Sequence, residues 1–123
     1  TEGELTLSDA STPRFLQGRF PFQGAGFDAL SGIDDTLALT VPAGATVQAV
    51  YFRGGNSSGE LITVALMHDG EPVRYFPIGA RDGTHVALRL VEDFPEGSEL
   101  GLALSAPEGA SGTVIIDLGL VEF

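Results

Sequence analysis

The chain has 123 residues, the length of one domain, and it carries 17 acidic against 6 basic residues, for a net charge of −11. A protein this acidic repels phosphate backbones and anionic membrane surfaces, so the composition excludes nucleic acid and membrane as partners. The absence of cysteine excludes disulfides, thiolate metal sites and a cysteine nucleophile.

The sequence contains neither a membrane span nor a signal peptide. No apolar run approaches the roughly 20 residues that a spanning helix needs. Residues 1–4 are acidic and polar, where a signal peptide would be basic and then apolar. Two alternatives stay open: a leader was removed, or only an initiator methionine was lost.

Residues 1–34 are predicted to form an extended N-terminal arm, with a possible short strand at residues 4–8. Glycine, proline and polar residues break the periodicity from residue 10 onward, yet four of the eight phenylalanines lie between residues 15 and 27. Either the core of the domain buries them, or a neighbouring subunit or larger surface does. The candidate partner-binding residues of this arm are Arg14, Phe15, Leu16, Arg19, Phe20, Phe22 and Phe27.

Residues 35–123 are predicted to form a β-sandwich domain. Apolar and polar residues alternate over residues 36–41, and Pro42 ends this strand because it cannot donate to a ladder. A strand over residues 47–53 and another over 61–68 follow. Asp69-Gly70 then predicts a two-residue hairpin turn, since both residues tolerate the positive φ of a type I′ turn.

The second half of the domain continues the pattern of strand and turn. Pro77 places the next strand, 73–78, at a sheet edge or makes it end there. Further strands are predicted over residues 84–91, 100–105 and 113–123. Because no segment shows helical spacing, the fold class is all-β: an antiparallel two-sheet β-sandwich, with the jelly roll favoured. An immunoglobulin-like sandwich is the second choice, weakened by the absence of cysteine and tryptophan.

No motif of an enzyme or a metal site is present. The chain has two histidines, His68 and His85, and it lacks a nucleophile elbow, a zinc-protease motif and a phosphate loop. Asp34 and Asp35, with Asp28 nearby, invite a calcium hypothesis, but adjacent residues of an extended chain point in opposite directions. We therefore predict a protein that is not an enzyme and has no cofactor and no metal.

Sugar binding is the alternative function. Many β-sandwiches bind glycans through an exposed aromatic platform with polar neighbours. Such a platform would use Tyr51 and Tyr75, the two tyrosines of the chain, or phenylalanines of the arm.

Three stretches carry a resemblance to a known family. They are Ile33-Asp34-Asp35-Thr36, Leu39-Thr40-Val41-Pro42-Ala43-Gly44-Ala45-Thr46-Val47 and Gly112-Thr113-Val114-Ile115-Ile116-Asp117-Leu118. Over residues 33–123 the chain resembles the small jelly-roll decoration or cement proteins of tailed-phage capsids. The resemblance implies a homo-oligomer, with a trimer favoured, on the outer capsid surface of the virion. It also implies the major capsid protein as partner and an N-terminal arm that clamps neighbouring capsomers.

The sequence thus predicts a non-catalytic structural protein that attaches by burying the phenylalanines of its arm against neighbours. Burial of one phenylalanine is worth about 1.5–3 kcal/mol. Deletion of residues 1–30 is then expected to leave a folded domain that no longer attaches. The alternative is a carbohydrate-binding module, which would be secreted.

Overall fold

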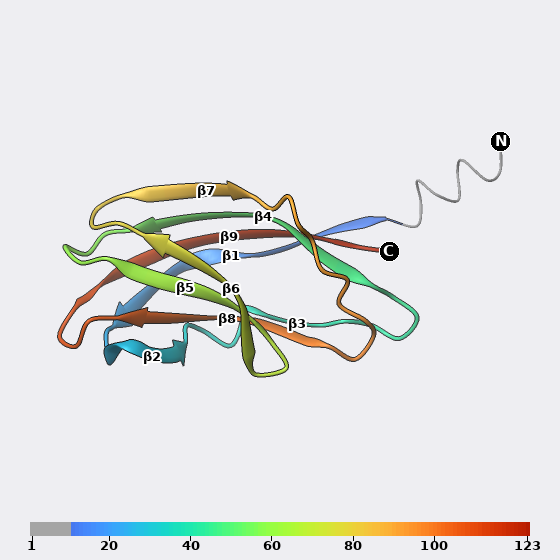
Figure 1. Cartoon of the computed structure of the whole chain (residues 1–123), viewed down its shortest axis with the longest axis horizontal. Helices are drawn as coiled ribbons and strands as arrows, with labels where there is room; N and C mark the ends of the chain where they lie inside the picture. The colour runs from blue at the N-terminus through green and yellow to red at the C-terminus, as the bar shows by residue number, and fades with distance from the viewer. Residues whose placement is uncertain (1–10) are drawn as a thin grey trace.

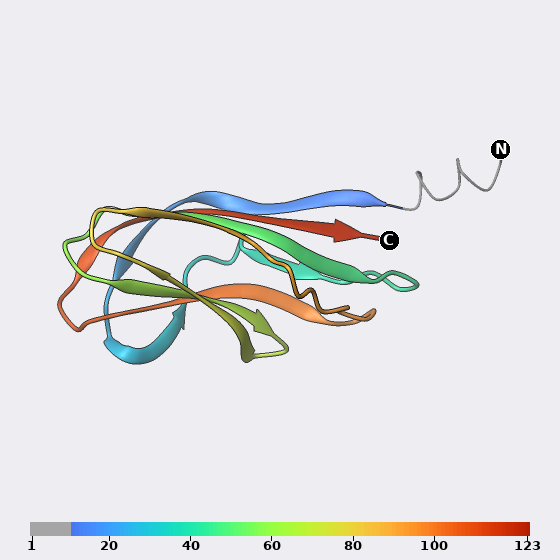
Figure 2. The same ribbon diagram turned by 45° about the horizontal axis from the view of Figure 1, so that its top comes forward.

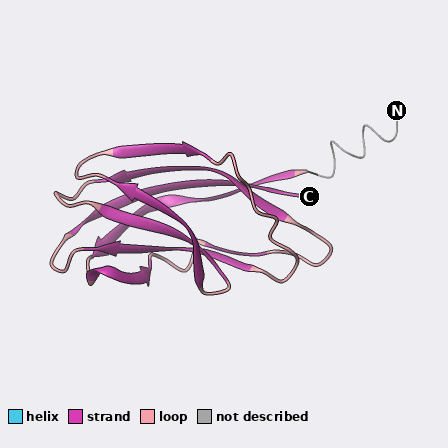
Figure 3. Ribbon diagram, in the orientation of Figure 1, coloured by secondary structure: helices cyan, strands magenta, loops and turns pink. Residues whose placement is uncertain are grey.

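The computed structural model describes residues 11–123, and the possible strand at residues 4–8 lies outside them. These residues form nine β-strands and no helix, so none of their segments is a helix that could cross a membrane (Figures 1 and 3). The strands are β1 (Thr12–Gln23), β2 (Gly26–Gly32), β3 (Ala38–Thr40), β4 (Val47–Asn56), β5 (Ile62–His68), β6 (Glu71–Ile78), β7 (Gly83–Ala87), β8 (Glu99–Ala106) and β9 (Ser111–Glu122).

Two antiparallel sheets pack face to face, as the turned view shows (Figure 2). The four-stranded sheet has the order β1-β9-β4-β7, and the five-stranded sheet has β2-β8-β5-β6 with the short β3 also beside β8. The pairs β1·β9, β2·β8, β4·β7 and β5·β6 nest inside one another along the chain and alternate between the sheets. This nesting is a rolled-up hairpin, so the predicted jelly-roll sandwich is confirmed.

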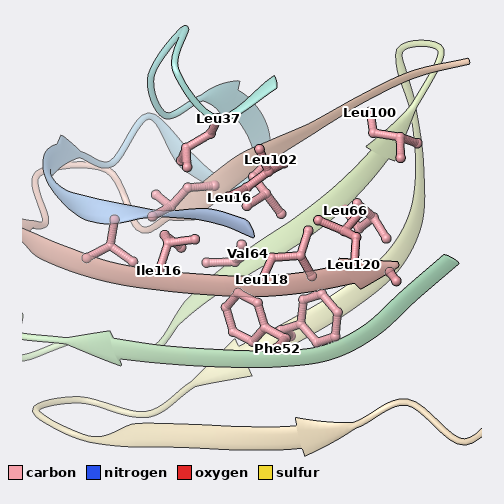
Figure 4. Packing of buried hydrophobic residues seen from close by; sticks show 14 of the residues in the cluster. Leu16, Leu37, Phe52, Val64, Leu66, Leu100, Leu102, Ile116, Leu118 and Leu120 are labelled. Atoms are coloured by element: carbon pink, nitrogen blue, oxygen red, sulfur yellow. The ribbon is translucent and has the colours of Figure 1, made fainter. Parts of the chain in front are cut away.

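The core fills the space between the sheets with alternate side chains of every long strand (Figure 4). Leu118 and Leu120 of β9 and Leu102 of β8 are buried there. Phe52 of β4 stacks on Phe76 of β6, with 4.3 Å between the ring centroids and 6° between the ring planes. Because these two strands belong to different sheets, this stack joins the two layers directly.

The predicted arm is wrong for residues 12–32, which form β1 and β2. β1 pairs with β9 along its whole length, from Thr12 opposite Glu122 to Gln23 opposite Ser111. From Leu16 to Phe22 its even-numbered residues face the core, and a Cβ at Gly18 would lie only 2.6 Å from the ring of Phe20. The first strand of a jelly roll pairs with the last. Because these two strands are far apart in the sequence, no local pattern predicts their pairing.

Several local predictions hold while two strands are shorter than expected. Asp69 and Gly70 have φ values of 50° and 83°, as the predicted hairpin requires. β6, which contains the predicted edge proline, is the edge of its sheet. The strands predicted over 36–41 and 84–91 shrink to β3 and β7. After β7 the chain leaves the sheet, and Phe94 enters the core and bridges to Val47.

Candidate functional site

The predicted partner-binding residues do not form one surface. Leu16, which is only 7% exposed, lies in the core, and Phe20 and Phe22 pack against it. The prediction is wrong for these three side chains because they stabilise the sandwich from within. Arg14 pairs with Glu122 at the start of the β1·β9 ladder, with 3.0 Å between Nε and Oε1.

The remaining predicted residues are divided between the outer faces of the two sheets, with Phe15 and Arg19 on the four-stranded sheet and Phe27 on the other. The outer face of the four-stranded sheet carries three cross-strand rows, which the register defines. The rows are Phe15–Gly119–Tyr51–Ala87, Gln17–Asp117–Arg53–His85 and Arg19–Ile115–Gly55–Gly83. Phe15 is 52% exposed and Ile115 is 49% exposed, so apolar surface faces solvent in two of the three rows.

A bonded cluster occupies the middle of this outer face. The hydroxyl of Tyr51 donates to Oδ1 of Asp117 at 3.1 Å, and Arg53 donates to Oδ2 through Nη2 at 2.7 Å and Nε at 3.2 Å. The ring of Tyr51 covers Gly119 so closely that a Cβ there would lie 1.9 Å from a ring carbon. His85 meets the ring edge-on, with 6.3 Å between centroids. The sheet therefore holds the ring in one place.

The same contacts set the ionisation of the cluster. Burial raises the pKa of the Tyr51 phenol above its usual value, and the hydrogen bond to the Asp117 carboxylate raises this pKa further. Asp117 also raises the pKa of Arg53. The pKa of Tyr51 is higher in the folded state than in the unfolded state. Its contribution to the free energy of unfolding is therefore fully present at pH values below the unfolded-state pKa. The contribution is lost as pH rises through the folded pKa.

We therefore expect Tyr51 to ionise at a higher pH in the folded protein than in urea. In a Tyr75→Phe background Tyr51 is the one remaining tyrosine, so ultraviolet absorbance during an alkaline titration reports it alone. Asp117→Asn should move the folded pKa back toward the usual value, because a neutral amide stabilises the phenol less against ionisation. An unchanged titration in Asp117→Asn would contradict the hydrogen bond.

Two adjoining hollows flank Ile115 at one end of this outer face. The first, of about 290 Å³, is lined by Arg53, Gly54, Gly55, Ile115 and Asp117. The second, of about 320 Å³, shares Gly55 and Ile115 and extends to Arg81. Arg81 has a φ of 51°, a left-handed conformation that costs a side chain of this size roughly 1–2 kcal/mol. The turn thus keeps a strained arginine beside the hollow.

Sequence reasoning missed most residues of this outer face. Period-two alternation places Tyr51, Arg53 and Gly55 on one face of a strand. The sequence therefore predicts that Tyr51 and Arg53, two members of the cluster, lie side by side. The sequence also predicts the strand over residues 113–123 that contains Ile115 and Asp117. It does not predict which strand lies beside that one. Only the β4·β9 register brings Asp117 opposite Arg53 and Ile115 opposite Gly55.

A serine, a histidine and an aspartate meet at the β5–β6 hairpin, but their geometry is not that of a catalytic triad. Nε2 of His68 lies 3.0 Å from Oγ of Ser98 and 3.3 Å from Oδ2 of Asp69, so both partners contact the same nitrogen. A triad needs the carboxylate on the other ring nitrogen. Ser98 is also only 3% exposed, which keeps its hydroxyl away from substrates.

Asp34 takes part in local structure. Its carboxylate accepts hydrogen bonds from the backbone and the side chain of Thr36, and these bonds hold the pKa of Asp34 below its usual value. These bonds between residues two positions apart form a local turn before β3. Among residues 11–123, no three His, Asp or Glu side chains gather as metal ligands.

The outer face of the five-stranded sheet has a hollow of its own, of about 220 Å³. Phe27 of β2 and Tyr75 of β6 both line it, so a residue of the predicted arm and a residue of the predicted aromatic platform come together. Tyr51 lies on the opposite sheet. The structure therefore separates the two tyrosines that the sequence grouped as one platform.

Comparison with known proteins finds similarity in structure alone. No protein-family model matches the chain, and no curated protein matches it. A family 35 carbohydrate binding module from Clostridium thermocellum is similar in structure, with a TM-score of 0.47 and 12% identity over 89% of this chain and 97% of that one. A chain of the infectious bursal disease virus Gt strain has a TM-score of 0.49 and 10% identity, over 93% of this chain and 33% of that one.

A chain of T=1 particles derived from infectious bursal virus has a TM-score of 0.50 and 12% identity, over 93% of this chain and 31% of that one. The present chain thus spans about a third of each viral chain. At such identities the likeness concerns the fold alone. It agrees with the strand order, and the chain is an antiparallel two-sheet β-sandwich of jelly-roll topology.

Proposed function

We propose that the protein is a non-catalytic structural β-sandwich that attaches to a larger assembly through the outer face of its four-stranded sheet. The observation that carries this proposal is the pair of exposed apolar side chains, Phe15 and Ile115, on neighbouring strands of that face. Each is about half exposed. Burying the exposed half against a partner is therefore worth about half of the roughly 1.5–3 kcal/mol of a complete burial.

The charges of the protein favour this outer face for contact. Arg19 lies opposite Ile115, and Arg53 belongs to the central cluster. Arg81 lines the second of the two hollows beside Ile115. Half of the six arginines of the chain thus lie on or beside one face of a protein with a net charge of −11. A partner meets less negative charge on approach here than an average surface of the molecule would present.

The open edge of the same sheet is less suited to attachment than its face. β1 and the five-residue β7 are the two edge strands of this sheet. β1, the longer one, contains Pro13 and Pro21, neither of which can donate a ladder hydrogen bond. Prolines and charged residues on an edge strand oppose pairing with another strand. Contact through side chains of the face therefore replaces the clamping arm that the sequence suggested.

The assembly we propose is the outer surface of a tailed-phage capsid, with the major capsid protein as partner and the protein itself as a trimer. The support is the sequence resemblance over residues 33–123, a jelly-roll fold and the acidity, which suits a surface away from packaged DNA. A chain of particles derived from infectious bursal virus has a similar fold, and we infer no function from that similarity.

The oligomeric state tests this proposal. Light scattering across a dilution series is expected to give a trimer mass at micromolar concentrations. Phe15→Ser combined with Ile115→Ser should leave this mass unchanged, because we propose that these two side chains contact the assembly and not another copy of the chain. Leu90→Ser removes an exposed apolar side chain outside this face and is the matched control, with no expected effect.

Attachment itself is measured by mass spectrometry of purified virions. Peptides of the protein should accompany intact capsids, whereas capsids produced with the Phe15→Ser, Ile115→Ser variant in place of the protein should lack them. A monomer at every concentration, together with virions free of its peptides, would falsify the proposal.

A further inference from the structure

The hollow on the outer face of the five-stranded sheet is built by an irregularity of the backbone. Between the pairs Gly26–Ala106 and Ser31–Leu104, four residues of β2 face the single residue Ser105 of β8. So much extra length cannot lie flat in the ladder, and the strand bulges. The bulge carries Phe27 to the rim of the hollow. In Figure 1, β2 lies beside β8, with β5 and β6 following in the same sheet.

The floor of the hollow is polar and narrow. Thr63 of β5 and Ser105 of β8 are direct cross-strand partners, so their hydroxyl-bearing side chains stand next to each other. The complete lining consists of Phe27, Asp28, Leu30, Thr63, Tyr75 and Ser105. A volume of about 220 Å³ is below the roughly 300–1,000 Å³ of sites for drug-sized ligands, so one small ring fits.

The walls are aromatic and face solvent. Tyr75 is 60% exposed and Phe27 is 46% exposed, although large apolar side chains are normally buried. Two exposed rings at one hollow offer flat apolar faces to a ligand, and Tyr75 adds a hydroxyl. Asp28 and Thr63 supply hydrogen-bond acceptors and a donor close by. This combination matches a ligand that has one apolar face and a rim of hydroxyl groups.

The charge of the lining restricts the ligand further. It contains one carboxylate, that of Asp28, and no cation, on a chain with a net charge of −11. Anionic ligands are therefore repelled. A quaternary ammonium group would suit the rings and Asp28, but it could form no hydrogen bond with the hydroxyl of Thr63. A neutral polyhydroxylated ring satisfies all of these groups.

We propose that this hollow binds one ring of a neutral saccharide, with the sugar packed against Phe27 and Tyr75. Hydroxyl groups of the sugar bond to Asp28 and Thr63, and Ser105, which is only 4% exposed, lies beneath them. The site goes beyond attachment to an assembly and does not depend on it, because it uses the opposite sheet.

The test is binding of the full chain to immobilised neutral gluco-, manno-, galacto- and xylo-oligosaccharides, followed by calorimetric titration of those retained. We expect at least one class to bind. Tyr75→Ala and Phe27→Ala should each weaken binding about tenfold or more, and Thr63→Val, which keeps the shape but removes a hydroxyl, should weaken it several-fold. Tyr75→Phe keeps the ring and should retain most of the affinity.

Controls locate the site and separate it from the attachment face. Phe15→Ser with Ile115→Ser should leave saccharide binding unchanged, and Tyr75→Ala should leave the oligomer mass unchanged. Melting temperatures check that each variant is folded. The inference is overturned if no neutral oligosaccharide binds the folded protein, if binding survives Phe27→Ala combined with Tyr75→Ala, or if choline binds in the hollow while saccharides do not.

Discussion

A chain that lacks residues 1–30 is expected not to fold, which is the opposite of what the sequence alone suggested. The deletion removes β1, which pairs with β9 over twelve residues, and most of β2. It also removes Leu16, Phe20 and Phe22 from the core side. Each buried apolar side chain is worth about 1.5–3 kcal/mol, against a total stability of about 5–15 kcal/mol for a domain. Circular dichroism on heating should show no cooperative transition.

Two neighbouring residues of β1 provide the matched point variants. Leu16→Ala should lower the free energy of unfolding by about 2–5 kcal/mol, because it empties a buried position. Phe15→Ala should change it by less than about 1 kcal/mol, because this ring points to solvent on the other side of the same strand. Equal effects of the two substitutions in urea titrations would contradict the placement of β1.

The sequence does not predict β1, because the period of two in this strand is interrupted. Leu16, Phe20 and Phe22 share one face of β1, but Gly18 stands where another apolar residue would complete the pattern. The ring of Phe20 covers that glycine, so the gap is filled by a neighbour rather than by a side chain of its own. Pro21 further weakened the strand signal, although proline is compatible with an edge strand. The turn at Asp69-Gly70 was predictable because two adjacent residues determine it.

The candidate sites were less predictable than the fold because each joins distant segments. Tyr51 and Arg53 share a face by alternation, but their partner Asp117 comes from a strand more than sixty residues away. Phe27 and Tyr75 line one hollow although they come from distant strands, and Phe27 lies within the bulge of β2, where Gly26 has a φ of 130°. The residue types predict an aromatic binding surface. Which aromatic residues lie at the same site depends on the pairing of strands that are distant in the sequence.

Phe52→Ala is expected to lower the free energy of unfolding by about 3–5 kcal/mol, the largest effect of a single substitution proposed for this chain. Phe52 is fully buried, and its ring stacks on Phe76 of the opposite sheet. The same ring covers Gly54, since a Cβ there would lie 2.7 Å from it. Removing the ring leaves a cavity between the two layers that backbone atoms of two sheets cannot close. Urea titration with an unchanged slope would give the loss directly.

Phe27→Ala is the matched control, because it deletes the same side chain from a position that is exposed. We expect a change in the free energy of unfolding of less than about 1 kcal/mol. The pair separates the two uses of phenylalanine in this protein: Phe52 joins the sheets, and Phe27 faces solvent at the saccharide hollow. If Phe27→Ala destabilises the fold as much as Phe52→Ala does, the ring of Phe27 has a structural role, and any loss of saccharide binding in that variant would follow from unfolding.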